Sequence, residues 1–135
     1  MNDSPDFTKR LMAIKKTILD GNVETMLLAI LDRAPSYGYE IVRLLNEQSS
    51  GVLSLGEGTV YPVLHRLEKR KLISSFWEKT DSGRPRKYYR LTKSGMKLLT
   101  ENRQQWTSLV KVMDAFLSPA GNDTSQTLLG GGASS

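Results

Sequence analysis

A hairpin pattern between two helical patterns is the feature that most limits the fold. The run "ISSFWEKT" (residues 73–80) is rich in aromatic and β-favouring residues, and "RKYYRLT" (86–92) is a second such run. The polar turn between them contains Gly83 and Pro85. Two such runs around a Gly-containing loop predict a β-hairpin.

The second strand of this hairpin has two different faces. Alternation places Lys87, Tyr89 and Leu91 on one face and Arg86, Tyr88 and Arg90 on the other. We expect Tyr89 and Leu91 to face the interior, whereas the side of Tyr88 stays undecided. On the first strand, Trp77 is expected to pack the hairpin against the core.

Four helical patterns precede the hairpin. The first, residues 5–20, has Phe7, Leu11, Ile14 and Ile18 at spacings of four, three and four. The second, "VETMLLAILDRA", has Asn22 as its expected cap, and Ser36 is the expected cap of the third. The fourth, "TVYPVLHRLEKRKL", places Val60, Leu64 and Leu67 on one face. Proline is tolerated only in the first turn of a helix. Pro62 therefore requires this helix to begin only a few residues earlier.

A long helix is predicted after the hairpin, over residues 93–117, with Thr92 as its cap. Its length of about 36 Å exceeds what a small three-helix core can cover. We therefore expect its apolar stripe to form a dimer interface with a second copy. The stripe comprises Leu99, Trp106, Val110, Met113 and Leu117.

This order of elements predicts a mainly α (α+β) winged helix-turn-helix. The expected organisation is an N-terminal helix (1–21), a winged-helix DNA-binding domain (22–92), a C-terminal dimerisation helix (93–118) and a disordered tail (119–135). The tail is rich in Gly and Ser.

The positive charge is concentrated in one part of the chain. Residues 1–57 carry six basic and eight acidic side chains, residues 58–93 carry ten and three, and residues 94–135 carry three of each. The middle window thus holds a net charge of +7 over the fourth helix and the hairpin. Clustered Lys and Arg attract phosphates, so a polyanionic partner is expected.

Composition argues against several other classes of protein. The chain has no cysteine and one histidine, so we expect no metal site and no cofactor. No nucleophile with a base is visible, so an enzyme is not expected. No run approaches the length of a membrane span and no signal peptide is visible, so a soluble, cytoplasmic protein is expected.

In a winged helix the recognition helix enters the major groove of double-stranded DNA, and the hairpin tip reaches the neighbouring backbone or minor groove. This geometry makes the exposed face of the fourth helix and the basic turn the expected DNA contacts. The predicted contact residues are Ser36, Tyr37, Thr59, Tyr61, Pro62, His65, Arg66, Lys69, Arg84, Arg86 and Lys87.

Three motifs together resemble the PadR family of bacterial transcriptional regulators. They are "YGYEI" (37–41), "GTVYPVLHRLEKRKLI" (58–73) and "GRPRKYYRLT" (83–92). Lys71 departs from the pattern, since many relatives have Gly there. The single long C-terminal helix resembles the compact branch of the family.

The resemblance implies a homodimeric repressor of transcription that a small molecule releases from its operator. Some compact relatives bind planar aromatic compounds near the dimer interface. Carried over to this chain, the effector-binding residues would be Trp106, Arg103, Asn102 and Met12, although plain dimer packing is the alternative for Trp106. Two other functions stay open: a protein-interaction winged helix, and a sensor of aromatic ligands with weak DNA binding.

Overall fold

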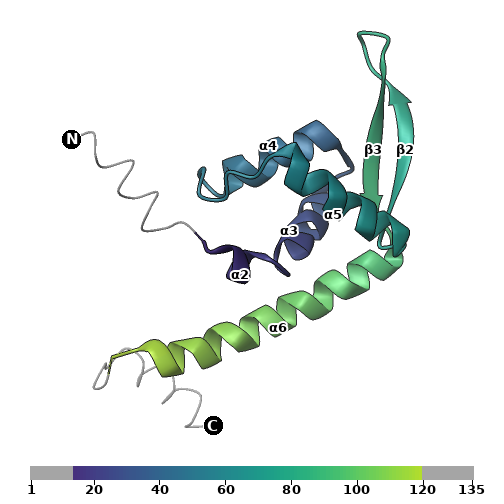
Figure 1. Ribbon diagram of the computed structural model, residues 1–135. Helices are drawn as coiled ribbons and strands as arrows, with labels where there is room; N and C mark the ends of the chain where they lie inside the picture. The colour runs from purple at the N-terminus through teal and green to yellow at the C-terminus, as the bar shows by residue number, and fades with distance from the viewer. Residues whose placement is uncertain (1–13, 120–135) are drawn as a thin grey trace, which may run out of the picture. The chain divides into compact units, whose positions relative to one another are not determined.

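The computed structural model describes residues 14–119 of the chain, which divides into a compact unit ending at Leu99 and a second beginning at Thr100. Figure 1 shows helices packed beside a long β-hairpin, which confirms the predicted winged helix. The elements are α2 (Lys16–Leu19), α3 (Val23–Arg33), β1 (Ser36–Tyr37), α4 (Gly38–Gln48), α5 (Glu57–Lys69), β2 (Ile73–Lys79), β3 (Pro85–Leu91) and α6 (Lys93–Leu117).

Helices α3, α4 and α5 enclose the hydrophobic core of the first unit. The predicted inward residues of α5 (Val60, Leu64 and Leu67) are fully buried. They meet Leu27 and Leu28 of α3 and Ile41 and Leu45 of α4, which belong to the same cluster of buried side chains. The helical periodicity in the sequence therefore predicted the core correctly.

The N-terminal helix prediction is tested only at its end. Phe7, Leu11 and Met12 lie outside the described residues, and α2 covers only Lys16–Leu19. Asn22 occupies the N-cap position of α3, as predicted, but makes no capping bond with its side chain. Its amide instead donates to the carbonyl oxygen of Ile18 at 2.6 Å.

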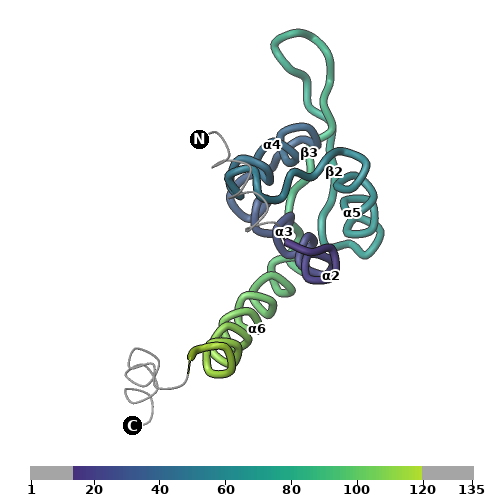
Figure 2. Tube along the Cα trace, turned by 60° about the vertical axis from the view of Figure 1, so that its left-hand side comes forward, coloured from purple at the N-terminus to yellow at the C-terminus, as the bar shows by residue number. Residues whose placement is uncertain are grey.

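The predicted hairpin is confirmed, and it carries a third strand that the sequence pattern did not indicate. The antiparallel sheet has the order β1-β3-β2, with Ser36 opposite Tyr89 and Tyr37 opposite Tyr88. The turn between β2 and β3 lies at the end of the hairpin farthest from α3 and α5 (Figure 2). The predicted cap role of Ser36 is wrong, because Ser36 lies in β1 and Tyr37 is the N-cap of α4.

Pro62 stands deeper in α5 than predicted. The helix begins at Glu57, so Pro62 is its sixth residue and lies in the second turn. Proline has no N–H, and the carbonyl of Gly58, four residues earlier, therefore receives no helical bond from it. Gly58 is exposed, so water can bond this carbonyl in place of the missing donor.

Helix α5 ends in a Schellman motif. The N–H of Leu72 donates to the carbonyl of Leu67, and the N–H of Lys71 donates to that of Glu68, both at 2.9 Å. The motif places Lys71 in the left-handed region at φ 64°, where a side chain is strained and glycine is not.

We expect Lys71→Gly to raise the free energy of unfolding by about 0.5–1 kcal/mol, because it removes this strain. Urea denaturation measures the change. Lys97→Gly, which changes an exposed lysine inside α6, is the matched control. It should lower the free energy of unfolding by a similar amount, since glycine is unfavourable inside a helix. A loss of stability in Lys71→Gly would contradict the strain argument.

Thr92 starts α6, as predicted. Its hydroxyl accepts the N–H of Gly95 at 3.0 Å and lies 2.8 Å from the carbonyl oxygen of Lys71. This hydroxyl therefore links the end of α5 to the start of α6. Gly95 and Leu99 are the buried residues of α6. Leu99 belongs to the core of its own chain, so its prediction as a dimer contact is wrong.

Candidate nucleic-acid interface

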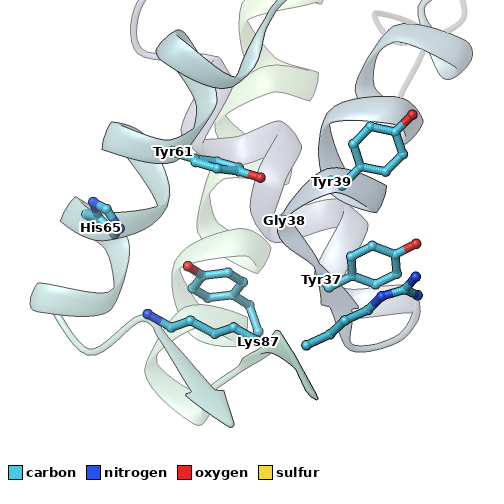
Figure 3. A pocket seen from close by; sticks show the side chains of 8 residues that line it. Tyr37, Gly38, Tyr39, Tyr61, His65 and Lys87 are labelled. Carbon is cyan, nitrogen blue, oxygen red and sulfur yellow. The ribbon is translucent and has the colours of Figure 1, made fainter. Parts of the chain in front are cut away.

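A groove of about 550 Å³ lies between α5, the start of α4 and strand β3. Figure 3 shows His65 and Tyr61 on the α5 side, Tyr37 and Tyr39 on the opposite side, and Lys87 below them. Gly38, Arg86 and Tyr89 complete the lining. The fold therefore brings together four tyrosines, one histidine and two cations from three separate segments.

Tyr61 reaches across this groove to the backbone of α4. Its ring points toward Gly38 (Figure 3), and a Cβ atom at Gly38 would lie only 2.9 Å from the ring. Glycine at position 38 is thus required for this close approach. Burial raises the pKa of the Tyr61 phenol, and nearby Glu57 and Tyr89 add to the effect. The phenol is therefore a neutral hydrogen-bonding group at neutral pH.

The exposed face of α5 carries the predicted contacts. Thr59, Pro62, Arg66 and Lys69 recur at spacings of three and four, so they lie along one side of the helix, and all are exposed. His65 is also exposed and lines the groove. This face is opposite to the buried residues Val60, Leu64 and Leu67, as predicted.

The inner face of the hairpin is tied to the end of α5 by Glu68. The hydroxyl of Ser75 donates to one carboxylate oxygen of Glu68, and the ammonium of Lys87 lies 3.8 Å from the other. Tyr89 on the same face is buried, as predicted. Lys87, a predicted phosphate contact, therefore already has a carboxylate partner.

Arginine and aromatic side chains stack in one row on the outer face of the sheet. The guanidinium of Arg86 lies 4.4 Å from the ring centre of Tyr37, which meets Tyr88 edge to face at 5.5 Å. Tyr88 stacks on Phe76 at 5.6 Å, and Phe76 lies under the guanidinium of Arg90 at 4.1 Å. Tyr88, whose side the sequence left undecided, is thus an outer-face residue that joins the three strands.

The basic side chains of α5 and the hairpin differ in whether they have acidic partners. Arg70 pairs with Glu24 at 3.0 Å, and Lys87 pairs with Glu68. By contrast, no ion pair formed within residues 14–119 involves Arg66, Lys69, Arg84, Arg86 or Arg90. These five cations lie on α5, on the turn of the hairpin and on β3. Their charge is therefore available to an anionic partner.

Two residues do not lie where the sequence placed them. Ser36 is 4% exposed, and its hydroxyl donates to the carbonyl of Ala34, so this side chain is not accessible for the predicted contact with DNA. Trp77 is 67% exposed, which makes its predicted role in packing the hairpin on the core wrong. On β2, Trp77 pairs with Lys87 of β3.

Sequence reasoning did not find Tyr39 or Glu68. Tyr39 is 60% exposed and lines the groove. Tyr39 is the second tyrosine of "YGYEI" and lies outside the basic window of residues 58–93. The local surplus of positive charge therefore did not point to it. The contact of Glu68 with the hairpin depends on tertiary packing and has no sequence signal.

The residues predicted for dimerisation and effector binding lie mainly on the C-terminal part of α6. Trp106, Val110, Met113 and Leu117 are exposed, with Trp106 at 54%. Arg103 is exposed and Asn102 is half-buried, and both make interactions within the chain.

No group of three or more His, Cys, Asp or Glu side chains in residues 14–119 could hold a metal ion. Over the same residues, no helix combines the length and the apolar character that crossing a bilayer requires.

The three-helix core, the three-stranded hairpin sheet and the basic face of α5 define a winged helix of the kind that binds DNA. Comparison with known proteins identifies the family. Residues 27–101 match the transcriptional regulator PadR-like family. The chain therefore belongs to this family, a class of transcriptional regulators rather than of enzymes.

Known relatives agree with this assignment. A PadR-like transcriptional regulator from Bacillus cereus superposes with a TM-score of 0.71 at 33% identity, over 77% of this chain and 99% of that one. A transcriptional regulator from Clostridium thermocellum gives the same TM-score at 30% identity, over 78% and 100% of the two chains. The transcriptional regulator Rv3488 of Mycobacterium tuberculosis is 39% identical over 82 residues, which cover 60% of this chain and 76% of that protein.

Proposed function

We propose that this regulator is a homodimeric repressor that places α5 in the major groove of its operator and the turn of the hairpin against the adjacent backbone. The contacts to DNA would come from Thr59, Tyr61, Pro62, His65, Arg66, Lys69, Arg84, Arg86 and Lys87. Phosphate contacts would position the protein, and the exposed face of α5 would read the bases.

The observation that carries this proposal is a set of cations on α5 and the hairpin that form no ion pair in the described part of the chain. Within residues 14–119, no ion pair involves Arg66 or Lys69 on α5 or Arg84 or Arg86 on the hairpin, whereas Arg70 and Lys87 are paired. A winged helix used only for protein interactions has no need for such a surplus. The distribution of charge therefore favours DNA over a protein partner.

Selection from a random DNA library, followed by footprinting of the enriched sequence, tests the proposal. Two α5 helices related by two-fold symmetry should protect two half-sites of opposite orientation, with centres about one helical turn apart. Enrichment of no sequence would contradict sequence-specific binding. A single protected half-site would contradict the symmetric dimer.

The proposed dimer rests on the apolar stripe of α6. Trp106, Val110, Met113 and Leu117 follow one another at spacings of four, three and four, and each is exposed in the single chain. Such a stripe is more apolar than the surface that a helix usually exposes to water. A second copy of the stripe would cover it in an isologous interface.

We further propose that a planar aromatic effector binds beside Trp106 in this dimer. A large aromatic ring near Arg103 and Asn102 combines apolar surface with polar groups, as ligand sites do. Met12, which was predicted to contribute, lies outside the described residues.

Trp106→Ala should abolish release by planar aromatic compounds. It should leave operator affinity within about twofold of wild type, because Val110, Met113 and Leu117 would still hold the dimer and α6 carries none of the proposed DNA contacts. Fluorescence anisotropy with labelled operator, with and without a panel of such compounds, measures both effects. Phe116→Ala, at another exposed aromatic of α6, is the control and should keep the response. Loss of the dimer in Trp106→Ala, seen by sedimentation, would assign Trp106 to packing instead.

A further inference from the structure

We infer that Tyr37 is a positioning residue that holds the Arg86 guanidinium at the groove for contact with DNA phosphate. The inference rests on the proposed function, since it assigns Arg86 to a phosphate contact. It differs from the sequence prediction, in which Tyr37 itself contacts DNA.

The first step is the placement of the Tyr37 ring. Tyr37 lies in β1 directly opposite Tyr88 of β3 and is also the N-cap of α4. Its ring meets Tyr88 edge to face at 5.5 Å, with 68° between the ring planes. Neighbouring contacts therefore fix the ring, and its position is set by the backbone of two strands.

The second step is the contact between this ring and Arg86. The guanidinium carbon lies 4.4 Å from the ring centre of Tyr37, within the range of a cation–π interaction. No ion pair involving Arg86 occurs in the described residues. The stack on Tyr37 is thus the contact that restrains Arg86, and it leaves the N–H groups of the guanidinium able to bond a phosphate.

The third step is the location of the pair. Tyr37 lies on the edge strand β1, and both Tyr37 and Arg86 line the groove between α5, the start of α4 and β3. An unrestrained arginine loses considerable rotamer freedom when it binds, whereas one already held in place loses less. Holding Arg86 at the groove before DNA arrives should therefore strengthen binding. The ring face of Tyr37 is itself covered by Arg86, so DNA contact by that face is blocked.

The same sheet contains a matched control. Arg90 stacks on Phe76 at 4.1 Å, and Phe76 also contacts Tyr88, but neither Phe76 nor Arg90 lines the groove. Phe76→Leu should therefore disturb the row of stacked side chains as Tyr37→Leu does, without loosening Arg86. A comparison of the two variants separates positioning of Arg86 from the general integrity of the sheet.

The test is a double-mutant cycle with the full-length protein and a fluorescein-labelled mixed-sequence DNA duplex of about 30 base pairs. We expect Tyr37→Leu to weaken binding about two- to fivefold per subunit, as loss of a partly exposed cation–π contact would. Tyr37→Phe, which keeps the ring and removes the hydroxyl, should bind like wild type, and so should Phe76→Leu. In the Arg86→Ala background, Tyr37→Leu should cause no further loss.

Several outcomes would overturn the inference. An equal loss from Tyr37→Leu with and without Arg86 would assign Tyr37 an independent role, and a loss in Tyr37→Phe would assign a direct contact to its hydroxyl. An equal loss in Phe76→Leu would assign the effect to the sheet. If Arg86→Ala weakens binding and Tyr37→Leu does not, only the positioning role fails. If Arg86→Ala has no effect, the proposed phosphate contact of Arg86 fails as well.

A measurement on wild-type protein covers the case in which Tyr37→Leu does not fold. The ring current of Tyr37 should shift the side-chain protons of Arg86 upfield in NMR spectra of the DNA-free protein. Tyr37→Phe should keep that shift. Random-coil shifts for Arg86 in the wild-type protein would contradict the stack.

Discussion

Gly95→Ala should lower the free energy of unfolding by about 3 kcal/mol or more, the largest effect that we expect from a single methyl group. Gly95 is buried in the first turn of α6. A Cβ atom there would overlap the carbonyl oxygen of Leu72 and lie 2.7 Å from Cδ1 of Leu91. The carbonyl belongs to the backbone that joins α5 to β2 and also accepts the Thr92 N–H, so it cannot move away freely.

Urea denaturation with Gly58→Ala as the control measures this effect. Gly58 lies in the first turn of α5, and nothing lies within 4 Å of an added Cβ atom there. Gly58→Ala should therefore be neutral or slightly stabilising, since alanine favours helix. A Gly95→Ala protein as stable as wild type would show that α6 does not start against Leu72 as described.

Arg84→Ala combined with Arg86→Ala should weaken DNA binding by roughly 10²–10³-fold at about 150 mM salt. The two substitutions together remove four phosphate contacts from a dimer, two in each subunit. The slope of log K against log salt should therefore become less steep by about 3.6. Because phosphates carry no sequence information, the loss should be similar for operator and for mixed-sequence DNA. Both side chains are exposed, so the fold should be unaffected.

Fluorescence anisotropy over a range of salt concentrations measures affinity and slope together. Lys15→Ala combined with Lys97→Ala is the matched control, because it removes the same formal charge from two exposed positions outside the basic window. The control should keep most of the affinity and most of the slope. An equal loss in both double variants would assign the effect to net charge rather than to the hairpin.

Local patterns predicted most of the fold. The spacing of Val60, Leu64 and Leu67 identified the buried face of α5, and the two β-type runs identified β2 and β3. The helix predicted over residues 93–117 agrees with α6 at both ends. These predictions were correct because each element depends on neighbours within a few residues, where hydrophobic periodicity determines the conformation.

Features that depend on contacts between distant segments escaped prediction. Strand β1 has only two residues, too few to show a period, and exists because Ser36 and Tyr37 pair with β3. The same pairing turned Ser36 inward and created the stack of Arg86 on Tyr37. Leu99 fits the heptad-like stripe of α6, yet tertiary packing buries it in the core of its own chain.

The sequence predicted where the positive charge of the candidate site lies, but it did not predict which side chains contact one another there. The basic window located α5 and the hairpin, because a surplus of charge is visible in composition alone. It did not reveal that Glu68 pairs with Lys87, while Arg84 and Arg86 form no ion pair within residues 14–119. Those differences arise from the packing of the hairpin on α5 and are decided by distances that no sequence pattern encodes.

A salt titration of wild-type protein on its selected operator tests the central claim most directly. With about four phosphate contacts in each subunit of a dimer, log K against log salt should fall with a slope near −7. Binding that depends on the unpaired cations of α5 and the hairpin requires a slope of this order. A slope near zero would show that phosphate contacts do not hold this protein on DNA and would contradict the account.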